Sequence, residues 1–427
     1  MPAERAETPL ARADTHRAAF VKQSTWLMVA TIAGGAMMWG VHFLNKAIPE
    51  SEYGLFVAFL SVAMCIPTMP LQMVLAQQTA QALATNRKRE LAGMIRLVCL
   101  LTFGVWLVSA VAVLLFQGKI LEIWHVSNSV GLWVTLAAVL LSLWVPLFSG
   151  VLQGQQNFMW LGWTMILNGI SRVGVASFAV LVLGGCAAGM MTGVLLGLVI
   201  AVAIAIWQTR AIWLAPSLPF DRRSLLGHVV PLMLGFGAFQ FLFTADTMFV
   251  KSYFTGDETA FYGSAGTLSR ALMWLVGPLA TVMFPRIVHS TAKAEKNDLM
   301  GLVLLGTAIL AIAGAVGLAL AGPLIVRVVA KASYVPVASS ILPWYAGAMV
   351  PLAMANVLVN NLLAKSDFRL VPWLVALALA YVLALTQFHA SLVQVLQTLG
   401  VACSVLFLIC AWFTWGAKGK ARAEAGG

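Results

Sequence analysis

The chain has 427 residues, of which 61% are hydrophobic and only 10% are charged. A soluble domain carries roughly 25% charged residues, so this composition excludes a soluble protein and predicts a chain embedded in a membrane. The net charge of +11 does not indicate a nucleic-acid partner, because the basic residues lie between apolar segments rather than in one patch.

Apolar stretches of the length of a membrane span recur along the chain, since about 20 residues cross a hydrocarbon core roughly 30 Å thick. Backbone groups in lipid must be hydrogen-bonded within the segment, and the stretches lack the alternation of a β-barrel, so each is predicted to be a helix. The predicted spans are 24–45, 53–82, 95–117, 130–152, 158–184, 186–208, 227–251, 258–285, 299–326, 335–363, 370–388 and 391–415. We therefore predict an all-α polytopic membrane protein with about twelve transmembrane helices.

A weak internal repeat divides these spans into two halves of six. Tyr53-Gly54 opens the second span and Tyr262-Gly263 opens the eighth, and the polar turn ending at Phe158 recurs at 364–368. Because six is an even number, both halves enter the membrane in the same direction, and a substrate site is expected where they meet.

The domain organisation follows from this division. We predict two lobes of six helices, joined by a cytoplasmic linker and flanked by cytoplasmic ends. The predicted segments are 1–22 (N-terminal segment), 23–208 (N-lobe, helices 1–6), 209–226 (inter-lobe linker), 227–416 (C-lobe, helices 7–12) and 417–427 (tail).

The basic residues indicate the orientation of the chain. With both termini in the cytoplasm, nineteen of the 26 Lys and Arg residues fall on the cytoplasmic side, five on the outer side and two inside the membrane. Cytoplasmic loops of membrane proteins carry such an excess of Lys and Arg. The distribution predicts cytoplasmic termini and accounts for the net charge.

Two arginines lie deep inside the apolar spans, one in each half of the chain. Arg172 is about halfway along the fifth span, with Asn168 four residues before it on the same helix face, and Arg270 is nearly halfway along the eighth span. A charge at this depth costs several kcal/mol and usually faces an interior. Because guanidinium binds two oxygens at once and stays protonated, Arg172, Arg270 and Asn168 are candidate contacts for a phosphate or pyrophosphate. Structural neutralisation of each arginine is the alternative.

Asp246 is the only acidic residue deep inside a predicted span. Its position in the seventh span allows an ion pair with Arg270, which is a structural role. The functional alternative is a coupling site, at which a proton or Na⁺ biases one conformation of a transporter. Both interpretations remain open from the sequence.

Other chemistry finds little support. The five cysteines and six histidines show no metal-ligand spacing, and no nucleotide-binding GxxxxGK[ST] loop occurs. Few acidic residues lie in the outer loops, whereas a membrane glycosyltransferase is expected to present several. We predict no metal, no cofactor and no catalytic residue, and an enzyme is disfavoured.

Short motifs carry a resemblance to a known family. They are Asp246-Thr-Met-Phe-Val-Lys-Ser-Tyr-Phe254, Tyr262-Gly263, Phe284-Pro285-Arg286 and the stretch from Leu44-Asn45 to Tyr53-Gly54. Together with the size and topology of the chain, they resemble the polysaccharide flippases of the multidrug/oligosaccharidyl-lipid/polysaccharide exporter superfamily.

The resemblance implies a V-shaped, two-lobed alternating-access transporter in the bacterial inner membrane. Its substrate would be undecaprenyl-pyrophosphate-linked oligosaccharide for O-antigen, capsule or exopolysaccharide, with cavity arginines neutralising the pyrophosphate. Membrane lipids, a coupling H⁺ or Na⁺, a polysaccharide polymerase and glycosyltransferases are the implied partners.

Two alternatives compete with the flippase. A cation-coupled multidrug or toxin extruder has the same fold, but its prokaryotic branch commonly carries an aspartate in the first helix, and the first span here has none. A membrane-embedded glycan transferase or polymerase is the second alternative.

The topology is testable with reporter fusions. Fusions after residues 50, 122, 255 and 331 should report the outer side, and fusions after residues 90, 220, 292 and 420 should report the cytoplasm, because the basic residues cluster around the second set. Alkaline phosphatase and green fluorescent protein activities measure the two outcomes. Two or more reversed fusions would overturn the map.

Overall fold

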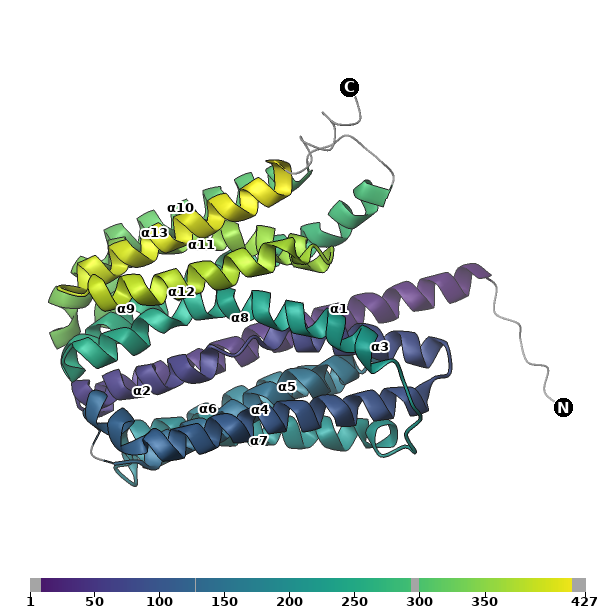
Figure 1. The fold of residues 1–427 in the computed structure, drawn as a ribbon, viewed down its shortest axis with the longest axis horizontal. Coiled ribbons are helices and arrows are strands. Elements are labelled where there is room, and N and C mark those ends of the chain that lie inside the picture. Colours follow the sequence, from purple (N-terminus) through teal and green to yellow (C-terminus); the bar gives the residue numbers. More distant parts are fainter. Residues whose placement is uncertain (1–8, 127, 293–298, 417–427) are drawn as a thin grey trace.

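The computed structural model describes residues 9–126, 128–292 and 299–416, and these form a bundle of long helices (Figure 1). The predicted tail at 417–427 and residues 1–8 of the predicted N-terminal segment lie outside the described residues. The α-helices are α1 (Pro9–Gly40), α2 (Glu50–Met64), α3 (Thr68–Ala84), α4 (Lys88–Ile123), α5 (Val130–Gly154), α6 (Phe158–Leu181), α7 (Cys186–Trp213), α8 (Arg222–Tyr253), α9 (Gly256–Ala292), α10 (Leu299–Val329), α11 (Val335–Ala364), α12 (Val371–Gln387) and α13 (Leu392–Ala411). Short helical turns are η1 (Val41–Ala47), η2 (Ala332–Tyr334), η3 (Phe368–Leu370) and η4 (Trp412–Gly416).

The all-helical membrane fold is confirmed. Within the described residues, eleven segments are long and apolar enough to cross a membrane. The remaining predicted span, 258–285, coincides with α9. The helices α1–α7 form the N-lobe and α8–α13 form the C-lobe. The connection between them is 214–221, which lies inside the predicted linker, and α1 already begins at Pro9, inside the predicted N-terminal segment.

The second span is broken, not continuous as the sequence pattern predicts. α2 ends at Met64 and α3 begins at Thr68, with Pro67 immediately before it. Proline has no backbone N–H and its ring clashes with the preceding helical turn, so the helix cannot pass through this position unchanged. At the break, the Cys65 sulfur lies 3.0 Å from the Thr244 hydroxyl of α8, which joins the two lobes.

Four helix connections share one turn. Asn86, His125, Gln156 and Ser366 follow α3, α4, α5 and α11, and each has a positive φ between 50° and 59°. In each turn the next N–H donates to the carbonyl five residues earlier, as in the Schellman motif that ends many helices. The turns at Gln156 and Ser366 are the ones matched in the sequence.

Both described chain ends lie at one end of the bundle, here called the terminal end (Figure 1). The ribbons of the two lobes diverge toward the terminal end and come together at the opposite end. Five bonds there join residues 45–50 of the N-lobe to the C-lobe. They are Asn45 Nδ2 to Val329 O (3.1 Å), Lys46 Nζ to Val328 O (2.7 Å), Lys331 Nζ to Ile48 O (2.6 Å), Lys331 Nζ to Glu50 Oε1 (3.5 Å) and Ser333 Oγ to Glu50 Oε1 (3.0 Å).

Gly54 of α2 lies directly against the backbone of α9. A Cβ atom added to Gly54 would lie 2.3 Å from the carbonyl oxygen of Gly256 and 2.9 Å from the backbone nitrogen of Ala260, both in α9. A side chain at position 54 would therefore overlap with this backbone. The packing of the opposite end depends on the missing side chain at this position.

Substitution of Gly54 should loosen this end of the bundle. Gly54→Ala is expected to destabilise the protein by about 1–3 kcal/mol, the usual cost of overpacking, and lower the melting temperature in detergent. Gly104→Ala in α4 is the matched control, because no atom lies within 4 Å of its added Cβ and alanine is the better helix former by about 0.5–1 kcal/mol. Equal melting temperatures for the two variants would contradict the close contact.

Candidate functional site

The two deep charges of the C-lobe form an ion pair. Arg270 Nη2 lies 2.7 Å from Asp246 Oδ1, which joins α9 to α8. The side chain of Asp246 is completely buried and that of Arg270 is 10% exposed. A buried pair of this kind is stable only when its remaining hydrogen-bonding groups are also satisfied.

Most of those groups have partners. The hydroxyls of Tyr262 in α9 and Tyr345 in α11 both donate to Asp246 Oδ2, the first at 2.8 Å. Arg270 also donates from Nε to the carbonyl oxygen of Phe243 at 3.1 Å and from Nη2 to the Thr247 hydroxyl at 3.0 Å. The network thus draws α8, α9 and α11 together around one carboxylate.

Arg172 of the N-lobe has a different environment. Its Nε is buried and has no hydrogen-bond partner among the described residues, and none of the carboxylates described forms an ion pair with it. Asn168 lies on the same side of α6, because a Cβ added to Gly197 of α7 would meet both Asn168 Oδ1 and Arg172 Cβ. Asn168 Nδ2 lies 3.7 Å from the sulfur of Met38 in α1. In the described part of the chain, Arg172 is therefore a cation without a carboxylate counter-charge.

His42 of η1 is a buried polar residue of the N-lobe. Its Nδ1 is 2.9 Å from the hydroxyl of Tyr53, whose ring packs against Tyr334 with centroids 6.2 Å apart. The described residues contain no side chain that hydrogen-bonds to both Arg172 and Arg270, so the structure does not join the two arginines through a shared partner.

Several residues of this region were not identified from the sequence as site residues. His42, Tyr262 and Tyr345 are 6% exposed or less, and buried polar side chains in an apolar chain are the signal that marks them. Tyr345 is 99 positions from Asp246, so no local pattern joins the two. The side chains of Phe284, Pro285 and Arg286, which contribute to the family resemblance, lie outside the described residues.

No group of three His, Cys, Asp or Glu side chains in the described parts of the chain could hold a metal ion. The polar chemistry of the membrane interior therefore comes from guanidinium, carboxylate, hydroxyl and imidazole groups. A permanent cation at Arg172 and a neutralised cation at Arg270 favour contact with an anion over contact with a cation.

Solved structures with the same fold are membrane transporters. The chain is similar to the inward-facing conformation of a multidrug resistance MATE family transporter of the MOP superfamily, with a TM-score of 0.66 and 13% identity over 95% of this chain and 99% of that chain. It is similar to the lipid II flippase MurJ in an inward closed conformation, with a TM-score of 0.67 and 14% identity over 92% of this chain and 87% of that chain. The outward-facing MATE transporter gives a TM-score of 0.60 and 14% identity over 95% of this chain and 97% of that chain. The fold is that of a two-lobed membrane transporter.

The family is shown by the sequence itself. The family described as polysaccharide biosynthesis protein matches residues 20–291, a range that includes Arg172, Asp246 and Arg270. The chain belongs to this polysaccharide biosynthesis protein family. A comparison with curated protein sequences finds no match.

Removing the carboxylate at the centre of the C-lobe should test the network. Asp246→Asn leaves the buried guanidinium of Arg270 without a counter-charge, and breaking a buried ion pair costs about 3–5 kcal/mol. We expect a strong loss of folded protein, measured as the monodisperse fraction in detergent and as the melting temperature.

The control is the ion pair at the edge of the lobe interface. Glu50 and Lys331 are each 28% exposed and 3.5 Å apart, so Glu50→Gln should cost about 0–1 kcal/mol. If Asp246→Asn is as stable as Glu50→Gln, the buried pair does not stabilise the C-lobe, and a purely functional role for Asp246 is favoured.

Proposed function

We propose that this protein is a flippase that exports undecaprenyl-pyrophosphate-linked oligosaccharide for cell-surface polysaccharide such as O-antigen, capsule or exopolysaccharide. Membership of the polysaccharide biosynthesis family and a fold shared with a lipid II flippase support this class of substrate. The lipopolysaccharide pathway is one setting in which such a substrate is exported.

The observation that carries the proposal is the uncompensated guanidinium of Arg172. Its buried Nε has no partner in the described part of the chain, and a charge that is held in an apolar setting without a counter-charge is costly. A pyrophosphate group would supply that counter-charge and accept two parallel N–H bonds. Asn168, on the same side of α6, would donate to the same group.

Arg270 is the second proposed contact, in the facing lobe. Its Nε and Nη2 are engaged by the protein, while a guanidinium has five N–H donors, so donors remain for a substrate oxygen. Asp246 would hold Arg270 in place and offset its charge. In this arrangement Arg172 would bind the anion more strongly, because its charge is not offset. Arg270 would be held in a fixed orientation by Asp246 and would bind the anion less strongly.

Alternating access supplies the transport step. We place the transporter in the bacterial inner membrane with cytoplasmic termini. The lobes are bonded together at the end opposite the termini, which in this orientation supports an inward-open state. The substrate would enter from the cytoplasmic leaflet, and the lobes would then rock to release it outside. Binding of H⁺ or Na⁺ at Asp246 is the proposed coupling event, because it would weaken the hold on Arg270.

A drug extruder is the second candidate function, because a multidrug MATE transporter shares the fold. The two functions differ in what a deletion strain accumulates. Loss of a flippase leaves lipid-linked oligosaccharide on the cytoplasmic leaflet, whereas loss of an extruder leaves the glycan unchanged and increases drug sensitivity. A missing lipid-linked intermediate would instead indicate a transferase or polymerase.

Variants of the two arginines test the anion-binding proposal. Arg172→Ala should reduce export at least tenfold with normal protein abundance, because the substrate pyrophosphate loses its uncompensated partner. Arg172→Lys should recover only part of the activity, since a point charge cannot form the bidentate fork. Surface polysaccharide per cell, normalised to the protein in the membrane, is the measurement.

Arg270→Ala should lower both export and abundance, because it also leaves Asp246 unpaired. The matched control is Arg327→Ala, an exposed arginine near the end of α10, which should retain normal export. Normal export from Arg172→Ala and Arg270→Ala at normal abundance would rule out pyrophosphate binding by the arginines.

A further inference from the structure

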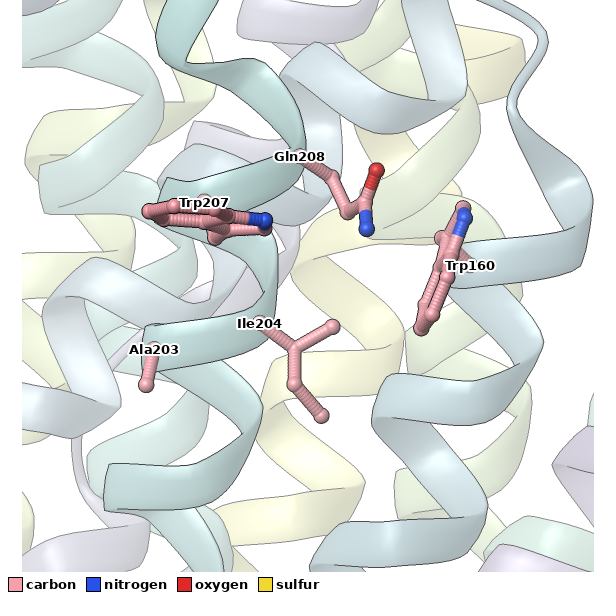
Figure 2. Close-up of a pocket in the computed structure, with 5 residues that line it drawn as sticks. All are labelled: Trp160, Ala203, Ile204, Trp207 and Gln208. Atoms are coloured by element: carbon pink, nitrogen blue, oxygen red, sulfur yellow. The ribbon is translucent and has the colours of Figure 1, made fainter.

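A hollow on the outside of the N-lobe lies away from the buried charges. It encloses about 510 Å³ between α6 and α7 near the terminal end, and it is lined by Trp160, Ala203, Ile204, Trp207 and Gln208 (Figure 2). Trp160 is twelve residues from Arg172 on α6, roughly 18 Å along the helix at 1.5 Å per residue. The hollow is therefore separate from the proposed substrate site.

The walls of the hollow are suited to hydrocarbon. The indole rings of Trp160 and Trp207 stand on either side, with Ile204 between them and the amide of Gln208 near the rim (Figure 2). The side chain of Trp207 is 62% exposed, and it comes from the last two turns of α7. Tryptophan at such a position marks the boundary between the hydrocarbon and the headgroups of a bilayer.

A basic side chain stacks on Trp207, one of the residues that line the hollow. The guanidinium carbon of Arg210 lies 4.1 Å from the centroid of the Trp207 ring, and Nη1 donates to the carbonyl oxygen of Trp207 at 2.6 Å. Stacking on the ring and this bond hold the guanidinium against Trp207, within reach of a ligand that fills the hollow and extends past this ring. No carboxylate in the described residues forms an ion pair with Arg210, so most of its five N–H donors are available to an anion.

From these observations we propose that the hollow binds one phospholipid with an anionic headgroup from the surrounding bilayer. An acyl chain fills the space between Trp160 and Trp207, while the headgroup phosphate accepts hydrogen bonds from Arg210 and from the Gln208 amide. Basic pockets between transmembrane helices at the cytoplasmic side are known to select anionic lipids in this way. The site is independent of the transported substrate.

The proposal rests on the combination of shape and charge at one place. A hollow without Arg210 would accept any acyl chain, and Arg210 without the hollow would attract any anion to the membrane surface. Together they favour a ligand that carries an apolar chain and a negative headgroup on one molecule. Such a lipid would also hold α6 against α7, and α6 carries Asn168 and Arg172.

The test is the affinity of the purified, delipidated full-length protein for two lipids. Phosphatidylglycerol and phosphatidylcholine with identical acyl chains are titrated, and native mass spectrometry gives the dissociation constant of the first lipid bound. We expect tighter binding of phosphatidylglycerol. Arg210→Gln should weaken phosphatidylglycerol binding about fivefold, the value of one basic side chain near a membrane surface, and leave phosphatidylcholine binding unchanged.

Two further variants make the result specific. Trp160→Ala should weaken the binding of both lipids, because it opens the wall that holds the acyl chain, and its elution in size-exclusion chromatography shows whether it remains folded. Arg327→Gln, at the other end of the bundle, should change neither affinity. Equal affinities of the two lipids for the wild type, or equal effects of Arg210→Gln and Arg327→Gln, would overturn the proposal.

Discussion

Because a charge in an apolar medium must be neutralised where it lies, the carboxylate of Asp246 determines how the C-lobe is assembled. Arg270 supplies the opposite charge from α9, and the hydroxyls of Tyr262 and Tyr345 satisfy the second oxygen from α9 and α11. The relative positions of α8, α9 and α11 are therefore set by hydrogen-bond geometry as well as by apolar packing.

The N-lobe lacks such a neutralised centre. α1 and α6 pack closely, with Gly34 and Gly169 at the contact, yet Arg172 is left with a buried Nε that nothing described in the protein satisfies. The two lobes thus differ electrostatically although their topology repeats. Among the described residues, the buried charge of the C-lobe is paired within the lobe, whereas Arg172 of the N-lobe has no carboxylate partner. A transporter whose cargo carries pyrophosphate would exploit that difference, because the cargo then completes the N-lobe.

The sequence predicts most of the fold because length and hydropathy alone determine where a helix crosses lipid. The repeated turn could also be predicted, since Gln156 and Ser366 are preceded and followed by similar residues. The break at Pro67 was not predicted, because other prolines such as Pro146 lie inside continuous helices and only tertiary contacts distinguish them. The depth of Asp246 and Arg270 indicated a pair, but Tyr345 comes from a helix 99 residues away.

The contact between Gly54 and Gly256 has a mechanical consequence. It joins backbone to backbone at the second turn of α2 and the first residue of α9, so any rocking of the lobes about it uses α9 as a lever. A helix of 37 residues is about 55 Å long at 1.5 Å per residue. A rotation of about 10° at such a fulcrum moves the far end of a lever of that length by roughly 10 Å. Wide opening at one membrane face therefore requires only a small angular change at the other. The missing side chains of the two glycines let the two backbones touch at the point of rotation.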